Sequence, residues 1–121
     1  MSTLRAGQIV LADWRDALPK EPNKLRPAIV VEDERLFPPD YSNVILVPLS
    51  GEMRAAPERL ALAIDPTPEN GCSNRCFALS YCVTTTSVAR LQATPSRILA
   101  DQLDAIRRQI AYAIGLEIIS P

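Results

Sequence analysis

The sequence predicts a mainly β, α+β fold: a strongly bent antiparallel sheet or small barrel with one helix packed against it. Short β-rich segments, separated by polar and proline-rich loops, fill most of the chain. From about Leu99 the spacing of apolar residues changes to that of a helix. Several strands followed by one closing helix are typical of a sheet that buries one side against that helix.

The expected strands are short apolar or alternating runs. They cover residues 8–14 (QIVLADW), 28–31 (AIVV), 44–49 (VILVPL) and 59–64 (RLALAI). Residues 76–88 (CFALSYCVTTTSV) form a longer β-rich stretch, which fits one bent strand or two short ones. The runs at 28–31 and 44–49 are apolar throughout, so we expect sheet that is covered on both faces.

Prolines and polar clusters mark the expected loops at residues 16–27, 32–43 and 65–74. Residues 52–58 fit one short helical turn. Pro27 favours an extended Arg26, Pro48 places the end of its strand at an edge or a bulge, and Thr94-Pro95 interrupts the chain again.

The closing helix is predicted from one apolar face. Its members recur at spacings of three and four residues, and they are Leu99, Leu103, Ile106, Ile110 and Ile114. Acidic residues precede basic ones along this segment, which suits the helix dipole. Gly115 is a plausible terminator, and an apolar tail of Leu116, Ile118 and Ile119 follows.

Composition limits the function classes. A chain of 121 residues fits one domain, residues 1–121. The net charge is −1, so any binding of nucleic acid must rest on a local basic patch. Histidine is absent, which removes Ser-His-Asp and Cys-His triads and the commonest metal ligand. We expect neither a metal nor another cofactor.

The three cysteines and the apolar runs bear on location. Cys72, Cys76 and Cys82 are an odd number, and no signal peptide or run of about 20 apolar residues is visible. We therefore expect a cytoplasmic protein that does not enter a membrane. The spacing of Cys72 and Cys76 resembles half of a zinc site, but no second ligand pair is obvious, so buried or idle thiols are the simpler interpretation.

Three segments together resemble a known family. They are GQIVLADW at 7–14, LRPAIVV at 25–31 and VILVPLS at 44–50, and the pieces at 89–91 and 114–116 also fit. In this order and spacing the sequence resembles the MazF/PemK toxins of type II toxin–antitoxin systems. It departs from the usual pattern at Gln8, in its proline-rich first loop, at Ser50 where threonine is frequent, and at Tyr81-Cys82 where many members carry Asp-Gln.

The resemblance implies a small SH3-like barrel of the CcdB/PemK type with a C-terminal helix, usually a homodimer. It implies a metal-independent endoribonuclease that cuts single-stranded RNA and is neutralised by a cognate antitoxin. It also implies that Arg26 and Ser50 are the catalytic pair. RNA supplies its own nucleophile, the 2′-hydroxyl, so the products would carry 2′,3′-cyclic phosphate and 5′-hydroxyl ends.

Simple chemistry fits these roles. Arginine is a permanently charged fork that matches phosphate oxygens, and a serine hydroxyl can orient the reacting groups. Arginine is also a poor general base, which predicts a slow enzyme. The structural alternatives are an ordinary surface charge at Arg26 and a plain turn residue at Ser50.

Further substrate-binding candidates are Trp14, Arg15, Lys20, Lys24, Thr84 and Thr85. Trp14 could stack on a base or belong to the core or an interface. The three basic residues lie in a loop that could cover RNA or simply be solvated. The threonines could touch phosphates or serve only as good strand residues.

Two other functions remain open at this point. The related CcdB-type toxins use the same architecture to inhibit DNA gyrase through protein contacts near the end of the last helix, where this chain has its apolar tail. The second is that the chain is a degenerate paralogue, which only binds RNA or an antitoxin.

Overall fold

The computed structural model describes residues 4–14, 25–52 and 58–116. The strands are β1 (Gln8–Asp13), β2 (Leu25–Val30), β3 (Asn43–Ser50), β4 (Leu62–Ile64), β5 (Cys76–Ala78), β6 (Thr84–Ser87) and β7 (Leu91–Arg97). The helix α1 spans Ala100–Ala113, and four 3-10 turns are η1 (Glu34–Leu36), η2 (Glu58–Leu60), η3 (Ser80–Cys82) and η4 (Val88–Arg90). The predicted order of strands followed by one helix is confirmed.

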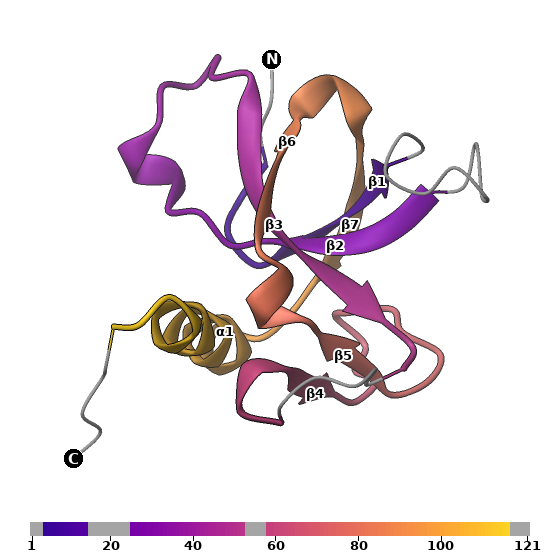
Figure 1. Cartoon of the computed structure of the whole chain (residues 1–121). Coiled ribbons are helices and arrows are strands. Elements are labelled where there is room, and N and C mark those ends of the chain that lie inside the picture. The colour runs from indigo at the N-terminus through magenta and orange to yellow at the C-terminus, as the bar shows by residue number, and fades with distance from the viewer. Residues whose placement is uncertain (1–3, 15–24, 53–57, 117–121) are drawn as a thin grey trace.

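The strands form one bent antiparallel sheet that is not closed into a barrel. Its strand order is β4-β5-β3-β2-β1-β7, and β6 pairs with the first part of β3. Figure 1 shows β4 and β5 as a small layer below the longer strands, with α1 beside them. Of the two forms that the sequence allowed, the structure has the open bent sheet.

Alternation along the central strands divides the core into two clusters. Ile29 and Val47 belong to one, whereas Ala28, Val30 and Leu46 belong to the other, on the opposite face of the sheet. All five side chains are at most 1% exposed. The expectation that residues 28–31 and 44–49 form strands covered on both faces is therefore confirmed for their central positions.

The helix closes the first cluster. Ile106 is fully buried, and Leu103 and Ile110 pack beside it. The Arg107 guanidinium donates from Nε to the carbonyl of Val31 (2.9 Å) and from Nη2 to that of Glu32 (3.1 Å), which ties α1 to the end of β2.

The ends of the predicted apolar face of α1 do not reach the core. Leu99 is 40% exposed and Ile114 is 75% exposed. Within the described residues, α1 is too short to cross a membrane, and no other helix there is long and apolar enough.

Several element boundaries differ from the predictions. Residues 25–27 belong to β2 rather than to the preceding loop. Pro27 pairs only with Leu11 of β1, because pairing with β3 begins at Ala28. The missing N–H of Pro27 therefore costs no hydrogen bond to β3. Pro48 stands where β3 changes its second partner from β6 to β5, so its missing N–H falls at the changeover.

Two further boundaries were wrong. Thr94-Pro95 does not break the chain, since both lie inside β7. The β1–β7 register shifts between Gln8 and Val10, and Pro95 sits in the resulting irregularity, where no ladder hydrogen bond is required. Residues 59 and 60 belong to η2, which leaves only three residues for β4. The stretch at 76–88 forms two short strands separated by η3.

Candidate functional site

A cavity of about 570 Å³ opens where β2 begins and β3 ends. Arg26 and Ser50 both line it, together with Trp14 after β1 and Tyr81 and Cys82 of η3. We call it the Arg26 cavity. Segments that are far apart in sequence thus place a cation, a hydroxyl and two aromatic rings around one space.

Strand register explains why Arg26 and Ser50 meet. The last recorded β2–β3 pair at this end is Ala28 opposite Pro48. Continuing that register by two residues in each strand puts Arg26 opposite Ser50, on the same face of the sheet. The β2–β3 ladder ends at the Ala28–Pro48 pair, while the end of β3 pairs with β5 along its other edge. Arg26 and Ser50 line the cavity beyond the end of that ladder.

Ser50 occupies the last position of β3. It pairs with Phe77 of β5, and its Oγ accepts a hydrogen bond from the backbone N–H of Glu52 at 3.1 Å. This contact makes Ser50 a turn residue, which the sequence analysis gave as the structural alternative to a catalytic role. It uses the oxygen as an acceptor, so the hydroxyl hydrogen can still be donated to a ligand.

Trp14 is held at the edge of the cavity by packing and by one hydrogen bond. Its ring packs against the cluster that contains Val30 and Leu46. Its indole Nε1 donates to Thr86 Oγ1 at 3.0 Å, and Thr86 is only 6% exposed. Trp14 therefore packs against the core and also lines the cavity, whereas its stacking on a base stays a prediction.

Tyr81 and Cys82 are cavity residues that the sequence reasoning did not propose as site residues. They lie on η3, and Tyr81 is 38% exposed. The only sequence feature that pointed to these two residues was their position, where many members of the resembled family carry an Asp-Gln pair. A departure from a family pattern was thus a pointer to the wall of the site.

The other proposed binding residues have different positions. Thr84 and Thr85 are exposed in β6 and do not line the Arg26 cavity. Because they are consecutive in a strand, their side chains point to opposite faces. Arg15, Lys20 and Lys24 lie outside the described residues.

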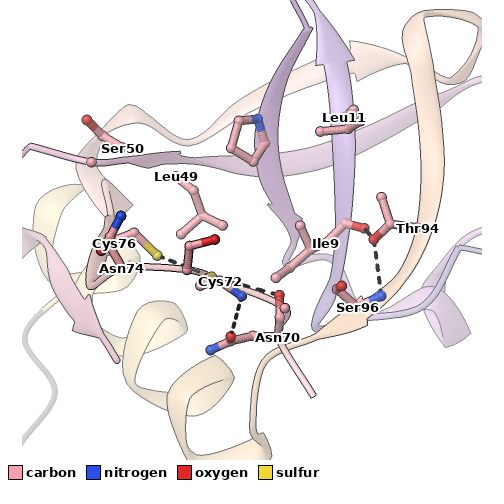
Figure 2. A pocket seen from close by; sticks show the side chains of 14 residues that line it. Ile9, Leu11, Leu49, Ser50, Asn70, Cys72, Asn74, Cys76, Thr94 and Ser96 are labelled. Carbon is pink, nitrogen blue, oxygen red and sulfur yellow. Dashed lines mark hydrogen bonds between the residues drawn. The ribbon is translucent and has the colours of Figure 1, made fainter. Parts of the chain in front are cut away.

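A second cavity of about 400 Å³ adjoins the Arg26 cavity at Ser50. Its walls include Leu49, Ser50 and Gly51, which it shares with the Arg26 cavity, and the thiols of Cys72 and Cys76. Figure 2 shows this space, which we call the cysteine cavity. Ser50 and its neighbours therefore border both cavities.

The two thiols of the cysteine cavity are in contact. Their sulfur atoms are 3.6 Å apart. Burial, followed by the hydrogen bond with Cys72, raises the pKa of the Cys76 thiol to about 12. Among the described residues no three Cys, Asp or Glu side chains gather as a group able to hold a metal ion.

Comparison with known families identifies the chain. The model of the PemK-like, MazF-like toxins of type II toxin–antitoxin systems matches residues 5–114. The chain belongs to this family. The resemblance inferred from three short segments is therefore confirmed over nearly the whole sequence.

Solved structures share the fold of this PemK/MazF-like toxin. An endoribonuclease in complex with its cognate antitoxin, from a mycobacterial species, is 15% identical with a TM-score of 0.72, covering 97% of this chain and 100% of that one. The Mycobacterium tuberculosis toxin MazF-mt6 is 22% identical with a TM-score of 0.70, covering 92% and 99%. MazF of a MazE–MazF complex from Deinococcus radiodurans is 16% identical with a TM-score of 0.67, covering 97% and 100%. Curated proteins gave no sequence match.

Proposed function

We propose that this PemK/MazF-like toxin is a metal-independent endoribonuclease that cleaves single-stranded RNA. The 2′-hydroxyl attacks the adjacent phosphorus, the 5′-oxygen of the next nucleotide leaves, and the products carry 2′,3′-cyclic phosphate and 5′-hydroxyl ends. The observation that carries the proposal is that Arg26 and Ser50 line one cavity, on strands whose register brings them opposite each other.

Arg26 would stabilise the charge that develops on the phosphorane. Arg26 is half-buried at the start of β2, where it is partly shielded from water. Electrostatic stabilisation is stronger in such a place than in bulk solvent, and it is often the largest contribution to catalysis. A fixed arginine fork also positions two phosphate oxygens at once.

Ser50 would orient the reacting phosphate. Its oxygen accepts a hydrogen bond from the Glu52 N–H, which helps to hold the oxygen in place. The hydroxyl hydrogen is then available to a non-bridging phosphate oxygen or to the 2′-oxygen. This role needs only a correctly directed donor, so threonine should replace serine better than alanine does.

Two aromatic rings suit a single strand whose bases are unstacked. Trp14 and Tyr81 border the cavity that contains Arg26 and Ser50. Stacking of bases on aromatic side chains is a general way to bind single-stranded nucleic acid. Arg15, Lys20 and Lys24 remain proposed contacts to the phosphate backbone, and so do Thr84 and Thr85.

The proposed partners follow from the family. Related structures include toxins bound to a cognate antitoxin or to MazE. We propose that this chain likewise binds a cognate antitoxin, that it forms a homodimer, and that it acts in the cytoplasm. An antitoxin that covers the Arg26 cavity would block RNA and catalytic residues together.

The test is cleavage of a long unstructured RNA by purified protein in EDTA. Wild type should cut it, and Arg26→Ala should be at least about 100-fold slower, the usual cost of removing one group that stabilises transition-state charge. Ser50→Thr should retain more activity than Ser50→Ala. The 5′ ends should accept phosphate from a polynucleotide kinase without prior dephosphorylation.

Arg108→Ala is the matched control, because Arg108 is an exposed arginine of α1 that pairs with Asp104 at 2.8 Å. It should cleave like wild type, and circular dichroism should show the same fold in every variant. Equal cleavage by wild type and Arg26→Ala would refute the assignment of Arg26. Loss of cleavage by wild type in EDTA would refute metal independence.

A second candidate function is favoured by the end of α1. Tyr112, Ile114 and Leu116 are 42%, 75% and 61% exposed. An exposed apolar end suits contact with another protein, as expected of a toxin that inhibits an enzyme such as DNA gyrase. Growth arrest on expression, with RNA left intact by the purified protein, would support this candidate against the endoribonuclease.

A further inference from the structure

The thiols of Cys72 and Cys76 are close together at a place where the backbone is fixed on both sides. Their sulfur atoms are 3.6 Å apart, and Figure 2 shows them side by side in the wall of the cysteine cavity. A disulfide requires about 2.05 Å between sulfurs. The two sulfurs must therefore move closer together by about 1.5 Å.

The segment before Cys72 is anchored by a buried asparagine. Asn70 is 3% exposed, and its Oδ1 accepts from the backbone N–H of Thr67 and of Cys72, at 3.1 and 2.9 Å. Its Nδ2 donates to the carbonyl of Asp65 at 2.9 Å. Gly71 has a φ of +64°, and a Cβ there would lie 2.9 Å from Ser96 Oγ.

The other thiol starts a strand. Cys76 is the first residue of β5 and pairs with Ile64 of β4. Ser73, Asn74 and Arg75, between the two cysteines, are exposed. The pair is therefore held at short range by fixed flanks, while the intervening residues are open to solvent and can adjust.

We propose that Cys72 and Cys76 form a redox-active pair that a small disulfide such as oxidised glutathione converts into an intrachain disulfide. In the first step the Cys72 thiolate attacks one sulfur of the oxidant and releases one thiol. In the second, the Cys76 sulfur attacks the mixed disulfide on Cys72 and releases the other thiol. Two cysteine protons are lost, the cysteine sulfurs are oxidised, and the two halves of the small disulfide are reduced.

The order of attack follows from the surroundings of the two sulfurs. Burial is the main reason why the Cys76 thiol has its pKa raised to about 12, so this thiol is protonated at neutral pH. A protonated thiol is a poor first nucleophile. Cys76 instead resolves a mixed disulfide that is already within reach, where proximity compensates for the small thiolate fraction.

The bond would act on the neighbouring site through the shared wall. Cys76 directly precedes Phe77, which pairs with Ser50, and Ser50 borders both cavities. Linking residues 72 and 76 draws the start of β5 toward the loop before it. The environments of Phe77, Ser50 and Gly51 should change. The environment of η1, which borders neither cavity, should not.

The experiment compares wild type, Cys82→Ser, Cys72→Ser and Cys76→Ser in glutathione buffers that contain EDTA. Cys82 lies in the Arg26 cavity and is not a member of the proposed pair. Cys82→Ser therefore removes one thiol, keeps the pair, and is the matched control. Wild type and Cys82→Ser should each lose two hydrogen atoms in mass, protect two thiols from alkylation, and recover on addition of dithiothreitol. The variants that lack one member of the pair should hold a glutathione adduct instead.

Peptide mapping of wild type and Cys82→Ser decides the outcome even where the other variants fail to fold. A bond between residues 72 and 76, with amide resonance shifts at Ser50 and Phe77, supports the proposal. Free thiols throughout, a bond that involves Cys82, or only bonds between chains would overturn it. Because mass and resonance shifts require no RNA, this result is independent of whether the protein cleaves RNA.

Discussion

Arg26 and Ser50 owe their candidate role to their place in the sheet more than to their chemistry. Each is an ordinary polar residue at a strand end, and neither would be distinctive alone. The β2–β3 register directs both to one face, and the cavity lies beyond the last pair of that ladder. In the proposed site, Arg26 at the half-buried start of β2 would supply the positive charge.

A further prediction at the residue scale concerns Trp14 and Thr86. Trp14→Phe removes the Nε1 donor and leaves the buried Thr86 hydroxyl without that contact. We expect it to lower the free energy of unfolding by about 1–3 kcal/mol, the cost of leaving a buried polar group unsatisfied. Thr86→Val should have a similar effect for the reciprocal reason. Urea unfolding measures both.

The double variant distinguishes this contact from general packing. If the hydrogen bond is the cause, Trp14→Phe with Thr86→Val should cost clearly less than the sum of the single variants. Strict additivity would contradict the assignment and leave lost packing as the explanation.

At the scale of elements, short turns of this chain are fixed by side chains that bond to the backbone. In η1, Asp33 Oδ1 accepts from the Arg35 backbone N–H at 3.0 Å and from Arg35 Nε at 2.9 Å, while its Oδ2 accepts from Nη2 at 2.7 Å. These contacts cap a turn that contributes no buried residue. Its order therefore depends on charge and hydrogen bonding rather than on the core.

That cap predicts a titration. The side-chain hydrogen bond from Arg35, with its backbone bond next in importance, lowers the pKa of Asp33 from 3.8 to about 2. Because the folded-state pKa lies below the unfolded one, the cap's contribution to stability is present above about pH 4 and is lost as the pH falls toward 2. Carboxyl NMR should show the low midpoint, and Arg35→Ala should move it upward. An unchanged midpoint in that variant would contradict the cap.

The loop at 65–75 gives the second prediction at this scale. Asn70→Ala removes three hydrogen bonds from a buried side chain. We expect a loss of about 3 kcal/mol in the free energy of unfolding, at about 1 kcal/mol for each bond. Asn70→Asp keeps the acceptor oxygen for Thr67 and Cys72, so it should cost less at neutral pH. Urea unfolding compares the two, and equal losses would show that the acceptor contributes nothing.

At the scale of the molecule, an open sheet depends on α1 to cover one of its faces. The first core cluster joins Ile29 and Val47 from the sheet with Ile106 from the helix. Arg107 adds two hydrogen bonds to backbone carbonyls at the end of β2. The helix is therefore part of the core of the sheet rather than an appendage.

Ile106→Ala tests this dependence. We expect a loss of about 2–5 kcal/mol, because the side chain is fully buried. We also propose that residues 1–121 are one domain, so far-ultraviolet dichroism and Trp14 fluorescence should report a single transition in wild type and in the variant. Ala105→Gly, at a partly buried helical position, controls for a general weakening of the helix. Separate melting of helix and sheet would contradict the single domain.

The sequence by itself determined that strands precede one closing helix, the buried character of residues 28–31 and 44–49, and the family. These features depend on local hydrophobic period and on short motifs, which are legible without tertiary contacts. Arg26 and Ser50 were also candidates from their motif positions. The strand through Thr94-Pro95 was missed because a proline is tolerated wherever a register shift removes the need for its N–H, and register is not visible in one strand alone.

Only the tertiary structure decided which side chains share a space. Tyr81 joins Arg26 and Ser50 through the placement of η3 behind the end of β3. Thr86, rather than the adjacent Thr85, contacts Trp14, because adjacent residues of a strand face opposite sides. Thr84 shares the face of Thr86 but lies two positions away along β6. Cys72 and Cys76 meet because Asn70 and the β4–β5 pairing fix the chain on either side. Such meetings depend on long-range register and on side-chain direction, and both are set only when the sheet assembles.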